Sequence, residues 1–309
     1  MMTDDRNSSK KWPQCGFEQF FDYVSNFVHL NINLGSQEAC RRYHDDWVGR
    51  YRSAIGSWTD YDVAIWSVRC RQSLKLSFSA TYFALSAEEA RKYNVLASAY
   101  YLAYYSILHA MWAVLFVHPD QSVNSITDIT HQKVANVFHS SFAGGNGHII
   151  QADAKGLAED LRFLREYYSY RMPLNSPFEE VIDISNAHIH LGGFVKQSIQ
   201  LANLHSHLVL KAAKRLGRVS ACVPNTHRDA FKEAFFRING KEHHSRGLRL
   251  LDPADLQAQG EYLAIGCDLL PLSIAYDHMF DDFMTYANGR RPTGPIIKKT
   301  RTLVFNALF

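Results

Sequence analysis

The sequence predicts a mainly α-helical protein built around an antiparallel four-helix bundle, and three observations support this. Apolar residues recur at three- and four-residue steps over long stretches, as they do on one face of an amphipathic helix. Capping residues precede several of these stretches. In such a cap, a Ser or Asp side chain accepts a hydrogen bond from a free backbone N–H group in the first turn of the helix. The 309 residues include only 17 Gly and 9 Pro. Few helix-breaking residues therefore interrupt the chain, as expected for long helices.

Composition and motifs exclude several classes of protein. Hydrophobic residues make up 47% of the chain and charged residues 20%, which excludes intrinsic disorder. The formal charge of +3 decides nothing about partners. Phosphate-binding loops, dinucleotide fingerprints, H-E-x-x-H and the nucleophile elbow are all absent. The five cysteines are odd in number and lack a C-x-x-C pair, so we expect a cytoplasmic protein with reduced thiols, no metal and no other cofactor.

The residues before the bundle divide into a tail and a module. Residues 1–11 are polar and are expected to form a disordered tail. Residues 12–85 form an N-terminal helical module that begins with helical spacing from Phe17 to Val28. Between Leu74 and Tyr82, apolar residues alternate with Lys, Ser and Thr, which is the period of a half-buried strand. The module is therefore expected to include a small β-hairpin.

The bundle is predicted over residues 86–217. A capping box at Ser86 and Glu89 begins the first long helix, and Pro119 ends it. The fourth helix begins where Ser176 supplies a cap, with Pro at the next position, and it reaches about Leu216. The four expected helices cover residues 86–118, 131–142, 154–172 and 176–216.

One stretch of the bundle is apolar enough to raise the question of a membrane. Residues 95–117 form a run of about 23 residues without a formal charge, roughly the length that crosses a bilayer. Ser, His and Tyr residues interrupt the middle of the run, where a lipid-facing helix would carry Leu, Ile and Val. We therefore expect no membrane association. The run is expected to be a core helix with these side chains buried: Tyr101, Tyr104, Leu108 and Trp112.

Residues 218–309 are predicted to form a C-terminal helical module with a basic tail. Asp252 and Pro253 begin a helix that is expected to reach about Asn288. Beyond it, Arg and Lys residues lie in a segment broken by Pro and Gly. The apolar residues 303–309 close this segment, which indicates a tail that docks on the rest of the protein.

Three segments resemble, in the correct order, the helices of HEPN domains. Residues 99–110, AYYLAYYSILHA, resemble the Tyr-Tyr, aromatic, His and Ala positions of the first HEPN helix. Residues 130–138 look like the second-helix block of a His, a Val and a Phe. Residues 161–170 are similar to the third-helix Leu-Arg block that ends in an aromatic residue. The resemblance covers about residues 87–217 and leaves both ends of the chain unexplained.

The resemblance implies an RNA-acting effector of a bacterial toxin–antitoxin or antiphage defence system. Catalytic members carry an Arg, usually followed by a polar residue, and a His a few residues later. The 2′-hydroxyl of RNA attacks the adjacent phosphate, the His shuttles the proton and the Arg stabilises the developing charge. The implied activity is a metal-independent endoribonuclease that leaves 2′,3′-cyclic phosphate ends. The implied partners are RNA, and either a second copy in a homodimer or a second defence or antitoxin protein.

The catalytic spacing of the family occurs in this chain only beyond the fourth helix. There Arg237 precedes His243 and His244, and Ile238 stands where the family has a polar residue. An exposed basic turn is the alternative interpretation of this segment. No Arg within the bundle has a His at that distance, which departs from the family. A second function therefore stays open, a non-catalytic helical interaction module that assembles with a separate defence enzyme.

The Tyr-rich end of the third helix supplies the candidate RNA-binding residues. These are Arg165, Tyr170 and Arg171. Guanidinium groups contact phosphates, and aromatic rings stack on unpaired bases. The alternative for the two arginines is ion pairing with acidic neighbours, namely Glu166, Glu179 or Glu180.

Overall fold

The structure, a computed structural model, describes residues 16–144, 148–171, 185–276 and 294–309. Within these ranges the protein is mainly helical, as the sequence predicts. The α-helices are α1 (Val28–Leu34), α2 (Gln37–Gly56), α3 (Asp60–Lys92), α4 (Leu96–Phe116), α5 (Val123–Thr127), α6 (His131–Phe138), α7 (Ala154–Glu166), α8 (Ser185–Leu216), α9 (Arg228–Asn239), α10 (Pro253–Ala264) and α12 (Pro295–Leu308). The short helical turns are η1 (Phe17–Phe20), η2 (His139–Ala143), η3 (Tyr167–Arg171), η4 (Asn225–His227) and η5 (His244–Arg246). The strands are β1 (Ser220–Ala221), β2 (Lys241–His243), β3 (Leu248–Leu250) and β4 (Cys267–Asp268).

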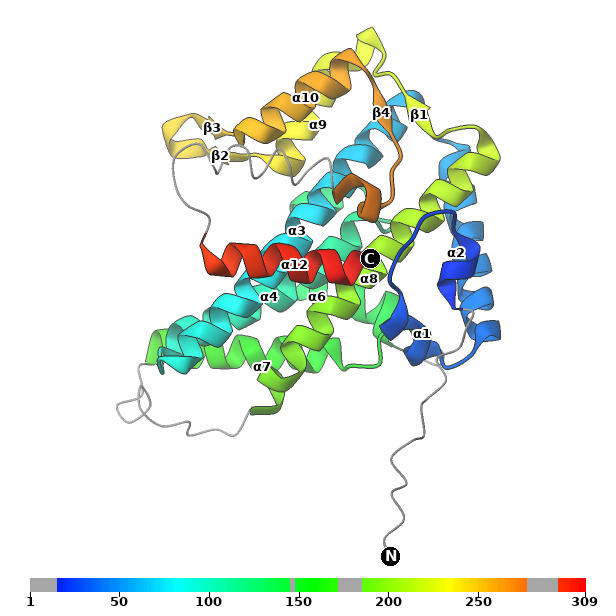
Figure 1. Cartoon of the computed structure of the whole chain (residues 1–309). Helices are drawn as coiled ribbons and strands as arrows, with labels where there is room; N and C mark the ends of the chain where they lie inside the picture. The colour runs from blue at the N-terminus through cyan, green and yellow to red at the C-terminus, as the bar shows by residue number, and fades with distance from the viewer. Residues whose placement is uncertain (1–15, 145–147, 172–184, 277–293) are drawn as a thin grey trace, which may run out of the picture.

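Helix α4 is the central element, and it packs against α3, α6, α7 and α8 (Figure 1). Small residues let α3 and α4 approach closely, since Ala80 and Ala113 are almost completely buried where the two helices meet. Two hydroxyls bond across this contact. Ser73 donates to the carbonyl of Ala113 at 2.7 Å, and Ser106 donates to the carbonyl of Ala80 at 2.8 Å. These bonds satisfy polar side chains inside the core and hold the helix pair in register.

Among the described residues, α4 is the one helix long and apolar enough to cross a membrane, and 72% of its most apolar 18-residue window is buried inside the protein. Tyr104 and Leu108 are buried as predicted, whereas Trp112 is only partly buried. The prediction for Tyr101 is wrong, because its side chain is 48% exposed. Tyr101 instead packs against Tyr105 at the surface, with 4.7 Å between ring centroids.

The predicted hairpin between Leu74 and Tyr82 is wrong, because this segment lies inside the 33-residue helix α3. Two of the polar residues that suggested a solvent-facing strand edge, Ser77 and Thr81, are buried in the helix. Ser77 donates to the carbonyl of Ser73 at 2.9 Å, and Thr81 donates to that of Ser77 at 3.0 Å. A hydroxyl that bonds back to its own helix can occupy a core position. The alternation therefore did not separate a buried face from an exposed one.

The capping box predicted at Ser86 does not begin a helix, because Ser86 lies within α3. The capping box that begins α3 joins Thr59 and Asp62, with the Thr59 N–H donating to the Asp62 carboxylate at 2.7 Å. Asn94, with φ of 56°, lies in the turn between α3 and α4. The predicted boundary between residues 85 and 86 thus falls inside a helix that packs against α4, α8 and α12.

The other bundle helices agree with the sequence where they are described. Helix α6 begins at His131 and α7 begins at Ala154, and η2 and η3 extend them. Helix α8 ends at Leu216 as predicted. The start predicted for the fourth helix, at residues 176–179, and the polar tail at residues 1–11 lie outside the described residues.

The two ends of the chain differ from prediction in local structure. Residues 17–27 form η1 and a stretch without regular structure, and α1 begins only at Val28, although Phe17 and Phe27 are both fully buried. The helix that begins at Pro253 ends at Ala264, not near Asn288. Gly266, with φ of 104°, then turns the chain so that β4 pairs with β1 in an antiparallel register. A Cβ at this glycine would lie 2.9 Å from the carbonyl oxygen of Ala221, so the turn requires glycine.

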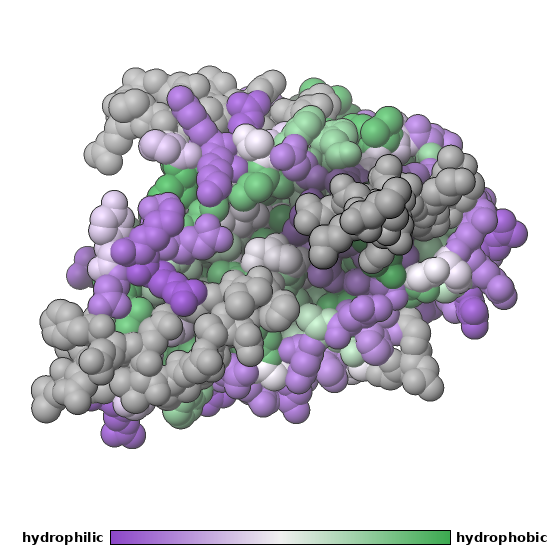
Figure 2. Space-filling view, turned by 60° about the horizontal axis from the view of Figure 1, so that its bottom comes forward, coloured by the Kyte–Doolittle hydropathy of each residue, from purple (hydrophilic) through white to green (hydrophobic). Residues whose placement is uncertain are grey.

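The apolar C-terminus docks as the sequence predicts. Helix α12 packs across α3 and α8 (Figure 1), with Val304, Ala307 and Leu308 buried. Helices α9 and α10 and the exposed β2–β3 hairpin lie together at the top of the molecule in Figure 1. Hydrophilic residues cover most of the described face in Figure 2, and hydrophobic residues lie in separate patches between them.

Candidate functional site

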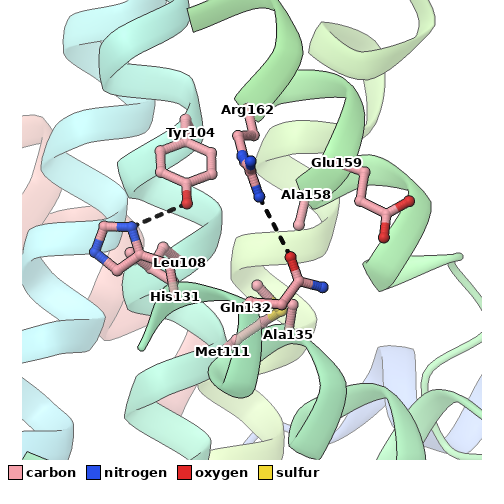
Figure 3. Close-up of a pocket in the computed structure, with 9 residues that line it drawn as sticks. All are labelled: Tyr104, Leu108, Met111, His131, Gln132, Ala135, Ala158, Glu159 and Arg162. Carbon is pink, nitrogen blue, oxygen red and sulfur yellow. Dashed lines mark hydrogen bonds between the residues drawn. The ribbon is translucent and has the colours of Figure 1, made fainter. Parts of the chain in front are cut away.

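Three bundle helices place aromatic, imidazole and guanidinium side chains around one small pocket (Figure 3). Tyr104 comes from α4, His131 is the first residue of α6, and Arg162 lies on α7. The cavity volume is about 20 Å³, enough for one water molecule or one oxygen atom of a ligand. The apolar part of the lining is Leu108, Met111, Ala135 and Ala158, and Gln132 and Glu159 are the remaining polar residues.

The Tyr104 hydroxyl lies 3.0 Å from Nδ1 of His131. Thr130 fixes the start of α6 by accepting the N–H of Lys133 at 3.3 Å, so His131 is held at the helix end. Burial lowers the pKa of His131, and the nearby charges of Arg165 and Arg162 lower it further. The imidazole is therefore neutral at pH 7. The second ring nitrogen, Nε2, lies on the side of the ring away from Tyr104 (Figure 3).

The two arginines of α7 share one carboxylate. Arg162 Nε donates to Glu166 at 3.0 Å, and Arg165 Nη2 donates to the same oxygen at 3.2 Å. Arg162 also reaches Gln132 on α6, at 3.4 Å. The Arg165 guanidinium lies over the Tyr104 ring, 4.6 Å from its centroid. Within the described part of the chain, the buried Nε of Arg165 has no hydrogen-bond partner. The two arginines thus carry one positive charge more than Glu166, and a second carboxylate, Glu159, lines the pocket.

Exposed aromatic rings flank these arginines. Phe163 and Tyr167 stack with their ring planes 10° apart, and the side chains of Phe163 and Tyr170 are 54% and 74% exposed. Burial, followed by Tyr105, raises the pKa of Tyr101, and both Arg165 and Tyr170 lie close enough to influence it. Exposed rings beside guanidinium groups are typical of surfaces that contact the bases and phosphates of single-stranded nucleic acids.

Two of the three predicted RNA-binding residues lie at this site. Arg165 forms the ion pair with Glu166 that was the alternative expectation, and it also covers Tyr104. Tyr170 lies near Tyr101. Arg171 is exposed at the end of η3, and its expected partners at residues 179 and 180 lie outside the described residues.

Sequence reasoning did not single out His131 or Arg162 as site residues. His131 is part of the second-helix block that resembles HEPN domains, and that block was the available signal. The two residues are 31 positions apart in the chain, and only the packing of α6 and α7 on α4 brings them to one pocket.

The predicted catalytic residues lie elsewhere, around a cavity of about 520 Å³ between α4, α9 and the β2–β3 hairpin. Arg237 and His244 both line it. Arg237 forms an ion pair with Asp128 and donates to the Asn124 side chain at 2.7 Å. The His244 ring is 86% exposed, 3.7 Å from Glu242.

His243 is 3.1 Å from the Ser245 hydroxyl and does not line the cavity. In the resting structure the two terminal nitrogens of Arg237 contact Asn124 and Asp128. The cavity also carries Lys241 and the carboxylates of Glu233 and Glu242, so groups of both charges line it.

Within the described ranges, no group of three or more His, Cys, Asp or Glu side chains lies close enough to hold a metal ion. Comparisons with protein-family models, with curated proteins and with solved structures find no match to this chain.

Proposed function

We propose that the protein is an RNA-acting effector that binds and cleaves a phosphodiester at Tyr104, His131, Arg162 and Arg165, here called the Tyr–His–Arg site. One observation supports this above all others. A neutral imidazole is held by a tyrosine hydroxyl at 3.0 Å beside two guanidinium groups. A neutral imidazole can accept a proton near pH 7, and guanidinium groups bind phosphate oxygens in pairs.

The reaction uses the 2′-hydroxyl of the substrate as its nucleophile. With Nδ1–H of His131 donating to the Tyr104 oxygen, Nε2 keeps a lone pair and takes the 2′-hydroxyl proton. The 2′-oxygen bonds to phosphorus, the bond from phosphorus to the 5′-oxygen breaks, and the protonated imidazole returns its proton to that leaving oxygen. Arg162 and Arg165 stabilise the negative charge that develops on the phosphate. The products are a 2′,3′-cyclic phosphate and a 5′-hydroxyl, so DNA, which lacks the nucleophile, is not a substrate.

The substrate phosphate competes with Glu166 for the two arginines. Arg162, followed by Arg165, lowers the pKa of Glu166, so this carboxylate is ionised in the resting site. The Arg162–Glu166 pair lies at the surface, where an ion pair contributes only about 0–1 kcal/mol. Arg165 is the more buried partner of this carboxylate, with its side chain 15% exposed. A polyanion that contacts several cations can therefore displace the carboxylate.

The alternative function is a non-catalytic interaction module that assembles with a separate defence enzyme. The exposed rings of Tyr101, Phe163 and Tyr170 favour this alternative, because large exposed aromatic side chains are common at binding surfaces. For the catalytic function we propose a homodimer or a complex with a second defence or antitoxin protein as the active assembly.

Cleavage of a fluorescently labelled single-stranded RNA by the purified chain tests this function. Wild-type protein should release 2′,3′-cyclic phosphate ends in the presence of EDTA, and it should not cut an RNA with 2′-deoxyribose at the scissile position. His131→Ala should lose about 10²–10⁴-fold in rate. Arg165→Ala should also lose activity, whereas the exposed Arg52→Ala serves as the matched control. Failure of the wild type to cut, alone or with its genomic partners, would favour the interaction module.

A further inference from the structure

A further pocket lies near the C-terminal end of α8, far along the chain from the Tyr–His–Arg site. It is formed where the residues between η1 and α1 run beside α8 (Figure 1). Its α8 wall consists of side chains four, seven and eight positions after a buried histidine, and these share one helix face. They are Lys211, Lys214 and Arg215, and His207 itself and Leu210 complete the α8 wall. The opposite wall is residues 20–23, and the cavity volume is about 200 Å³.

Aromatic rings line this pocket. The His207 ring centroid lies 4.7 Å from that of Phe21 and 6.3 Å from that of Tyr23. The ammonium groups of α8 lie over the same rings, with Lys211 6.0 Å from the Phe21 centroid and Lys214 5.5 Å from the Tyr23 centroid. The pocket therefore offers flat apolar surfaces directly beside positive charge.

The pocket carries a surplus of positive charge. Lys211, Lys214 and Arg215 face a single carboxylate, Asp22, which leaves two unmatched positive charges. Lys214 pairs with Asp22 at 2.9 Å, and this pair lowers the pKa of Asp22. Lys211 donates to the carbonyl of Phe20. Arg215 has no ion-pair or hydrogen-bond partner within the described part of the chain and stays available to a ligand.

His207 gives the pocket a fixed, uncharged floor. Its ring is 2% exposed, and Nε2 lies 2.8 Å from the Ser25 hydroxyl. Burial lowers the pKa of His207 to about 3, so the ring adds no charge to the floor of the pocket. Cations near a helix C-terminus also stabilise the helix dipole. That explanation accounts for Lys214 and Arg215, but it does not require an aromatic cavity beside them.

We propose that this pocket binds a nucleoside monophosphate, either free or as the 5′-terminal nucleotide of an RNA. The base packs against the rings of Phe21 and Tyr23, and the phosphate contacts Lys214 and Arg215 at the mouth. The cavity is smaller than the roughly 300–1,000 Å³ of drug-sized sites, so it takes one ring system and leaves the phosphate near the surface. This site does not depend on the proposed cleavage activity, since it shares no residue with the Tyr–His–Arg site.

Isothermal titration calorimetry on the full chain tests the pocket with four probes: AMP, adenosine, inorganic phosphate and a 5′-phosphorylated trinucleotide RNA. AMP should bind more tightly than either adenosine or phosphate. The double change Lys214→Gln/Arg215→Gln should weaken AMP at least tenfold and leave adenosine unchanged. Tyr23→Leu should weaken both AMP and adenosine. The exposed Lys299→Gln is the matched control for loss of a surface cation.

The remaining comparisons distinguish a free nucleotide from an RNA end, and binding in the α8 pocket from binding at the Tyr–His–Arg site. Equal binding of AMP and the trinucleotide identifies an RNA end as a ligand, and binding of AMP alone identifies a free nucleotide. His131→Ala should bind AMP like the wild type, which assigns the binding to the α8 pocket. The proposal is overturned if neither phosphorylated probe binds, or if the Lys214→Gln/Arg215→Gln variant binds AMP as tightly as the wild type.

Discussion

The hydroxyl of Tyr51 lies 2.9 Å from Nδ1 of His205, and both side chains are completely buried. The same hydroxyl contacts the carbonyl of Val117 at the end of α4. A carbonyl only accepts, so Tyr51 donates to Val117 and accepts the Nδ1–H of His205. Tyr43, 2.9 Å from Nε2, must then donate to the ring. These bonds define the His205 tautomer and join α2, α4 and α8.

Removing this hydroxyl should destabilise the fold. Tyr51→Phe leaves the Nδ1–H of His205 and the carbonyl of Val117 without their partner, so we expect a loss of about 1–3 kcal/mol in the free energy of unfolding. Urea unfolding followed by circular dichroism measures the change. Tyr93→Phe, at a position that is 78% exposed, is the matched control. An unchanged unfolding midpoint for Tyr51→Phe would show that this bond does not contribute.

Acid should destabilise the protein below about pH 6.5. Burial lowers the pKa of His118 to about 4 and of His207 to about 3, and it lowers the pKa of His205 well below its usual value. The unfolded chain takes up protons near pH 6.5, whereas the folded chain does not. Folding is therefore weakened as pH falls, by about 1.4 kcal/mol per pH unit for each such histidine.

Urea unfolding at pH 8, 6.5 and 5 measures this loss. The three histidines together should lower the free energy of unfolding by up to about 5 kcal/mol between pH 6.5 and 5. A stability that stays flat over this range would mean that the buried rings are charged or accessible in the folded protein.

The carboxylate of Asp255 should contribute much more to the free energy of unfolding than a surface carboxylate does. Asp255 is 1% exposed, lies 2.9 Å from Arg71 Nε and also contacts Lys75. Asp255→Ala leaves two cations of α3 without a counter-ion, and we expect a loss of about 3 kcal/mol. Asp229→Ala removes an ion pair whose carboxylate is 96% exposed and should cost less than about 1 kcal/mol. Similar thermal shifts for the two variants would contradict the buried network.

Substitutions in the FFRINGKEHH segment should separate the two candidate catalytic sites. Because Arg237 is paired with Asp128, we expect Arg237→Ala and His243→Ala/His244→Ala to keep RNA cleavage close to wild type. His131→Ala should lose it by about 10²–10⁴-fold. Single-turnover cleavage rates measure both. Loss of cleavage in the Arg237 variant, with His131→Ala still active, would assign catalysis to the cavity beside α9 instead.

Cleavage by the Tyr–His–Arg site should decline in acid. Burial, then Arg165 and Arg162, hold the pKa of His131 below its usual value. The imidazole must be neutral to take the 2′-hydroxyl proton, so the rate should fall once the pH drops through that lowered pKa and stay constant above it. Arg165→Lys moves the nearest charge and should shift the acid limb of the rate profile. A profile without an acid limb would exclude His131 as the base.

The sequence by itself determined the features that depend on neighbouring residues. Apolar spacing and capping side chains predicted the helical class, the starts of α6 and α7 and the docking of the apolar C-terminus, because helix periodicity and caps are local in the chain. Local signals failed where a side chain found its partner inside the fold. Ser77 appeared polar and exposed, yet it is buried with its hydroxyl bonded to its own helix.

The candidate site was decided by tertiary structure. His131, Arg162 and Tyr104 lie on three different helices, and no spacing in the chain links them. Their meeting depends on how α6 and α7 pack against α4, which is set by the shapes of buried side chains far apart in sequence. The sequence did identify Arg165 and Tyr170 as candidates, because an arginine beside tyrosines on one short segment is a local signal. The His131 imidazole is brought to these residues only by the packing of the helices.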